Sequence, residues 1–72
     1  MITDVQHHEF AANDHRFDVR TENPADADAI VTWANHNNVW FEADVLGSMH
    51  LIEVRTADRK LAMTFKMMWC GA

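Results

Sequence analysis

The chain has 72 residues and a formal charge of −5 at pH 7, from eleven acidic and six basic side chains. A chain of this length forms one domain, residues 1–72, whose core rarely contributes more than about 3–5 kcal/mol. The negative charge argues against direct binding to nucleic acid or to anionic membranes, where Lys and Arg must neutralise phosphates, whereas it permits a basic protein partner.

Residues 15–21, HRFDVRT, alternate between polar and apolar side chains, which predicts a strand with Phe17 and Val19 on its inner face. Residues 1–14 have two interpretations. Either a turn at residues 11–14 folds them back as a further strand, or they form a loose arm. The hairpin would bring together three cross-strand pairs, Phe10 with His15, Glu9 with Arg16, and His7 with Asp18.

The clearest helix signal lies in residues 21–38, TENPADADAIVTWANHNN. Asn23 is a favourable N-cap, and Pro24 at the first helical position loses no hydrogen bond. The run of polar residues at 35–38 ends the pattern, because Asn tolerates the left-handed conformation found after helices. We therefore expect a helix over residues 24–36, with an apolar stripe formed by Ala27, Ile30, Val31 and Ala34.

From residue 39 the apolar side chains recur with a period of two, which predicts strands. Residues 39–46 (VWFEADVL) form the first, and residues 49–56 (MHLIEVRT) form the second after a turn at residues 47–48. A turn at residues 57–59 leads to KLAMTFKMMW, residues 60–69, which we interpret as a third strand. One face of this strand would carry Leu61, Met63, Phe65, Met67 and Trp69, and the other Ala62, Thr64, Lys66 and Met68.

Together these elements predict an α+β fold with two layers. A four- or five-stranded, mainly antiparallel sheet carries one helix on one face, in the order β(β)αβββ. The uncovered face mixes charged and large apolar side chains, a combination typical of a contact surface. The alternative is that these apolar residues are isolated, or are covered by the N-terminal arm. We predict a partner-binding surface formed by Trp40, Glu42, Asp44, Leu46, Met49, Leu51, Glu53 and Met68.

We predict no metal site, no catalytic site and no cofactor. Among the five histidines only His7 and His8 are close in sequence, and neighbouring strand residues point to opposite faces. A soft-metal set of Met63, Met67, Met68 and Cys70 would be divided between two faces of the predicted strand. Cys70 lies near the end of the chain, where a nucleophile is poorly held, and two glycines provide no phosphate-binding loop.

The single cysteine cannot form an internal disulfide, which favours a reducing compartment such as the cytoplasm. Asp4 and Glu9 stand where a signal peptide would carry its apolar run, so we expect no secretion signal.

These features predict a non-enzymatic protein-binding module, an inhibitor or modulator of a basic, nucleic-acid-handling protein. In size and charge, though in no residue pattern, the chain is similar to small phage-encoded inhibitors of host defence, anti-CRISPR proteins among them. One alternative is a homodimer or larger homo-oligomer, self-associating through the open sheet face or an edge strand. A second is a His-based metal binder. The acidic residues either imitate nucleic acid or only promote solubility.

Overall fold

The computed structural model describes residues 4–11 and 13–69. In chain order the elements are β1 (Asp4–Ala11), β2 (Asp14–Thr21), α1 (Pro24–His36), β3 (Trp40–Leu46), β4 (Met49–Thr56) and α2 (Arg59–Trp69). Cys70, considered above as a nucleophile and a soft-metal ligand, lies outside the described residues, as do residues 1–3. No helix in this part of the chain is long and apolar enough to cross a membrane.

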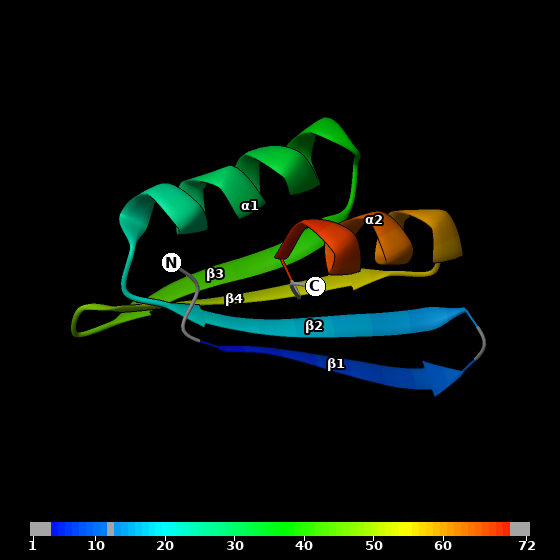
Figure 1. Ribbon diagram of the computed structural model, residues 1–72, viewed down its shortest axis with the longest axis horizontal. Coiled ribbons are helices and arrows are strands. Elements are labelled where there is room, and N and C mark those ends of the chain that lie inside the picture. Colours follow the sequence, from blue (N-terminus) through cyan, green and yellow to red (C-terminus); the bar gives the residue numbers. More distant parts are fainter. Residues whose placement is uncertain (1–3, 12, 70–72) are drawn as a thin grey trace.

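The four strands form one antiparallel sheet in the order β1-β2-β4-β3, and both helices lie on the same side of it (Figure 1). This arrangement confirms the predicted α+β class. The prediction of a single covering helix is wrong, because α2 lies beside α1 over the same sheet face. We call that side the helix face, and we call the opposite side, on which no described element packs, the open face.

The N-terminal hairpin is confirmed, but its predicted register is wrong by one residue. His7 pairs with Phe17, His8 with Arg16, and Glu9 with His15. A bulge lies between Glu9 and Ala11. After it, at the turn, the pairing returns to the predicted register, with Ala11 opposite Asp14. Because a one-residue slip moves every side chain to the other face, His7 points to the helix face with Phe17 rather than opposite Asp18.

Helix α1 begins and ends where the sequence predicts. The Asn23 side-chain oxygen accepts a hydrogen bond from the Ala25 backbone N–H at 2.9 Å, as expected of an N-cap followed by Pro24. Past its last residue, Asn38 adopts a left-handed conformation with φ of 55°. Ala27, Ile30 and Ala34 are buried against the sheet, as the apolar stripe predicts.

The segment predicted as a third strand of the meander is instead helix α2. Asp58 starts it, since its carboxylate accepts hydrogen bonds from the backbone N–H groups of Lys60 at 2.8 Å and Leu61 at 3.3 Å. The sequence pattern was ambiguous because residues four apart share a face in a strand and in a helix alike. Leu61, Phe65 and Trp69 therefore fit both structures, whereas Met63 and Met67, which share their face in the predicted strand, are exposed.

The core lies between the helices and the helix face. Its centre is a cluster of aromatic rings around Phe65, which is fully buried. The Phe65 ring lies 4.5 Å from Phe17 of β2, 4.8 Å from Trp69 and 5.5 Å from Trp33 of α1, measured between ring centroids. One side chain thus joins α2 to the sheet and to α1. The aliphatic part of the core is formed by Val19, Ile30, Val39, Ile52 and Val54.

Replacing Phe65 by Ala should lower the free energy of unfolding by about 3–5 kcal/mol, because it removes a fully buried ring and leaves a cavity. Since a domain of this size has little stability in excess, the variant should be largely unfolded at room temperature. Urea denaturation followed by circular dichroism measures the change. The control is Met67→Ala on the same helix, which is 79% exposed and should change stability by less than about 0.5 kcal/mol. Similar midpoints for the two variants would contradict the assigned role of Phe65.

Candidate functional site

The open face carries most of the surface that the sequence predicts for partner binding. Trp40, Glu42, Asp44 and Leu46 alternate along β3 away from the helices, because Phe41 and Ala43 pair with Val54 and Ile52 of the core. The same register places Met49, Leu51 and Glu53 of β4 on the open face. The predicted position of Met68 is wrong, because this residue belongs to α2 on the other side of the sheet.

The apolar residues of the open face do not form one continuous patch. Leu46 pairs with Met49 at the β3–β4 turn, and Leu51 lies one row further along the sheet. Trp40 lies at the other end of β3, opposite Arg55, about 20 Å from Leu46 along an extended strand. Trp40 is 50% exposed and Leu46 is 73% exposed. The strand therefore has an exposed apolar side chain at each end.

Carboxylates occupy the middle of this surface, and they differ in their pairing. Asp18 on β2 contacts Arg16, with 3.1 Å between its carboxylate oxygen and the guanidinium, and Glu53 lies within 4 Å of both Arg16 and Arg55. The hydrogen bond from Arg16 and the charge of Asp18 raise the pKa of Arg16, which therefore stays charged. Glu42 and Asp44, by contrast, form no ion pair within the described part of the chain.

The position of Glu42 adds to the excess of negative charge on this surface. It lies directly opposite Glu53 in the β3–β4 register, a like-charge pair that destabilises a sheet. Beside it lies a shallow depression of about 310 Å³, where four carboxylates outnumber the single cation, Arg20. The carboxylates are those of Asp18, Glu42, Asp44 and Glu53, and the rest of the lining is apolar. A positively charged side chain entering this depression would relieve the repulsion.

Strand β3 is also an edge of the sheet. Its seven residues pair with β4 on one side, and no described strand lies on the other. The β3–β4 register is regular, and the strand contains neither Pro nor Lys, two residues that often protect edges from further pairing. The Val45 N–H donates to the Asp44 carboxylate at 2.8 Å. The other backbone N–H and C=O groups that face away from β4 are available to an added strand. Glu42 and Asp44 are the charged residues along this edge.

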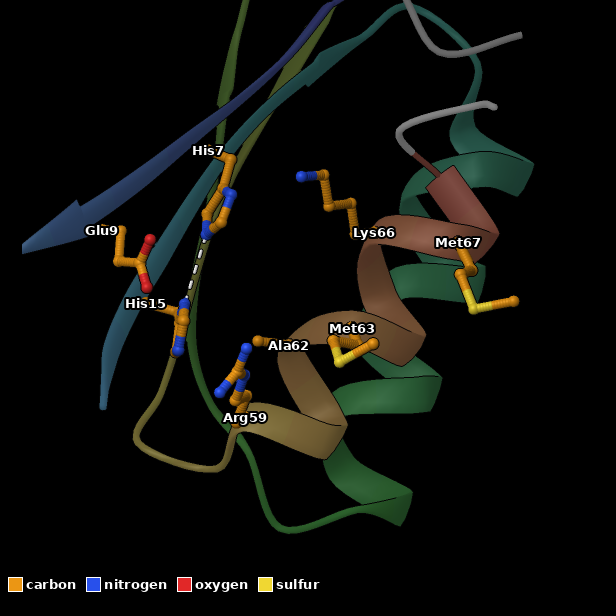
Figure 2. A pocket seen from close by; sticks show the side chains of 8 residues that line it. All are labelled: His7, Glu9, His15, Arg59, Ala62, Met63, Lys66 and Met67. Atoms are coloured by element: carbon orange, nitrogen blue, oxygen red, sulfur yellow. Dashed lines mark hydrogen bonds between the residues drawn. The ribbon is translucent and has the colours of Figure 1, made fainter. Parts of the chain in front are cut away.

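The structure also shows a second polar site, which the sequence did not predict. A pocket of about 470 Å³ lies on the helix side, between the β1–β2 hairpin and α2, and we call it the histidine pocket (Figure 2). The hairpin contributes His7, Glu9 and His15. Helix α2 contributes Arg59, Ala62, Met63, Lys66 and Met67. The sequence did not predict this pocket because the predicted hairpin register was wrong by one residue and because residues 59–69 were expected to form a strand.

Within this pocket the two histidines contact each other. His7 Nε2 lies 3.3 Å from His15 Nδ1, and the His7 ring stacks on Phe17 with 4.4 Å between centroids. Burial lowers the pKa of His7, and the positive charge of Lys66 lowers it further, followed by His15 and His8. Glu9 acts in the opposite direction. Neutral His7 is therefore favoured, and Figure 2 shows the Lys66 side chain reaching toward its ring.

Within residues 4–11 and 13–69, no three side chains of His, Cys, Asp or Glu come together in a way that could hold a metal ion. The chain matches no protein-family model, and comparisons with curated proteins and with solved structures find no significant match.

Replacing Lys66 by Met should raise the pKa of His7, because it removes the positive charge that lowers this pKa most while keeping an unbranched side chain. Titration of the His7 ring protons by NMR measures this pKa. Lys60→Met is the matched control, since Lys60 lies on the same helix but does not line the pocket, and it should leave the His7 pKa unchanged. An equal effect of both variants would mean that net charge, rather than Lys66 itself, governs His7.

The lowered pKa of His7 also predicts a dependence of stability on pH. Below pH 6.5, the ordinary pKa of histidine, His7 binds a proton more readily in the unfolded chain than in the folded chain. The contribution of His7 to the free energy of unfolding should therefore be fully present above pH 6.5 and should decrease as the pH falls through the folded-state pKa. Urea midpoints measured between pH 7.5 and 5 should fall less in His7→Gln than in the unaltered chain. Parallel curves would contradict the assignment.

Proposed function

We propose that this chain is a non-enzymatic protein-binding module that captures a basic, extended segment of another protein along β3. The observation that carries the proposal is the pair of carboxylates, Glu42 and Asp44, on an exposed, regular edge strand, where neither forms an ion pair with any described residue. An added strand would gain main-chain hydrogen bonds from the edge. Its Lys or Arg side chains would meet the depression lined by carboxylates.

The two ends of β3 suit such a segment. Trp40 at one end and Leu46 at the other offer apolar contacts to the flanks of a bound strand, with the charged contacts between them. Binding energy in protein interfaces is concentrated in a few such residues, Trp above all. The formal charge of −5 would further accelerate the encounter with a positively charged partner.

Self-association through the same edge is the competing proposal, and the charges oppose it. An antiparallel pair of β3 strands centred on Ala43 would place Glu42 of one copy against Asp44 of the other, twice. Moving the centre of this pairing to Glu42 brings Glu42 against Glu42, and moving it to Asp44 brings Asp44 against Asp44. Like charges directly opposite destabilise a sheet, so these pairings all favour a basic partner over a second copy.

A basic segment that contacts nucleic acid is the partner that best fits this chemistry, because such segments present Lys and Arg to phosphates. Occupying that segment with carboxylates would block its access to nucleic acid. We therefore propose that the module inhibits or modulates a nucleic-acid-handling protein.

A peptide of alternating Lys and Val residues should bind along β3, and the same peptide with Glu in place of Lys should not. Amide shifts in an NMR titration locate the peptide, and we expect the largest shifts at Trp40–Leu46. Glu42→Gln should weaken binding about 2- to 5-fold, and Trp40→Ala at least about 10-fold. Glu22→Gln is the charge-matched control, since Glu22 is exposed and lies outside the sheet, and it should have no effect.

Equal binding of the two peptides, or shifts confined to other strands, would refute the proposal. Light scattering after size exclusion tests the competing one. If the chain is a dimer at tens of micromolar and becomes a monomer when β3 is disrupted, β3 binds a second copy of the chain rather than a basic partner.

A further inference from the structure

We propose that the histidine pocket, on the side of the sheet opposite the open face, binds a small molecule that carries a carboxylate on an apolar chain. This site is separate from β3 and does not depend on the function proposed for that strand. Its parts come from three elements, the strands β1 and β2 and the helix α2 (Figure 2).

The charge of the pocket has the opposite sign to that of the protein. Arg59 and Lys66 both line it, and neither forms an ion pair within the described residues. Glu9 is the single carboxylate among the lining residues, so it offsets only one of the two positive charges. In a chain with eleven acidic residues, two cations without ion-pair partners around one pocket indicate a site for an anion. The same two cations oppose the binding of a metal ion.

His15 supplies a second, independent indication. Its side chain is only 5% exposed, and its Nε2 atom has no hydrogen-bond partner among the described residues. In the tautomer in which the His7 Nε2–H donates to His15 Nδ1, the ring N–H of His15 lies at Nε2. In that tautomer the buried N–H lacks an acceptor, which is costly, and a carboxylate oxygen would satisfy it. Figure 2 shows Arg59 at the same end of the pocket as His15, so one carboxylate could meet both.

The remaining wall is apolar. Ala62, Met63 and Met67 form it along one side of α2, where the two methionines are four positions apart. Both methionines are more than half exposed to solvent. Neighbouring exposed apolar side chains of this size often mark a binding surface. Unbranched Met side chains adapt to varied apolar surfaces. The volume of about 470 Å³ falls within the range of small-molecule sites.

Sodium octanoate, used below its micelle concentration, is the probe. NMR titration of the full chain should shift the ring protons of His7 and His15 and the methyl groups of Met63 and Met67. Octylammonium has the same chain with the opposite charge, and inorganic phosphate is an anion without a chain. Neither should produce these shifts at equal concentration.

Lys66→Met and Arg59→Gln should each weaken octanoate binding about 3- to 5-fold, the loss expected from one charged contact at a partly exposed site. Lys60→Met, the control on the same helix, should leave the affinity within about 2-fold. Equal shifts with octylammonium would overturn the anionic part of the proposal, and equal shifts with phosphate would overturn the apolar part. The absence of any octanoate-induced shift in the folded chain would overturn both.

Discussion

The contact of Phe65 with Phe17 and Trp33 is the constraint on which the rest of the structure depends. It closes the layer of helices over the sheet, because α2 reaches Phe17 on one side and α1 on the other through this ring. The hairpin joins the same cluster, since His7 stacks on Phe17. Among the described residues, Phe17 and Phe65 are the largest side chains that are fully buried, and so small a domain has little other buried surface to compensate for their loss.

This cluster determines where binding surfaces can form. Because both helices pack on one face, the other face and the edge strand β3 are left to the solvent. Because α2 packs beside the β1–β2 hairpin, its Arg59 and Lys66 line the same pocket as His7 and His15. The result is a separation of charge: as far as the structure describes the chain, carboxylates without ion pairs lie along β3 and cations without ion pairs line a pocket on the other side.

Local patterns predicted part of this fold well. The Asn23–Pro24 start, the apolar stripe of α1 and the alternation of β3 and β4 depend on neighbours in sequence, and the structure confirms them. The same alternation correctly assigned Trp40, Glu42 and Leu51 to the open face. The hairpin register could not be predicted this way, because a single bulge after Glu9 shifts every pair beyond it.

The sequence by itself determined the α+β class, the helix over residues 24–36, the open face of β3 and β4, and the excess of negative charge. Only the tertiary structure decided the state of residues 59–69, because spacing by four satisfies a strand and a helix equally and the contact of Phe65 with the core resolves the choice. The tertiary structure also decided where the histidine pocket forms. His7 and His15 lie eight positions apart in sequence, and the pairing of the hairpin brings their rings into contact.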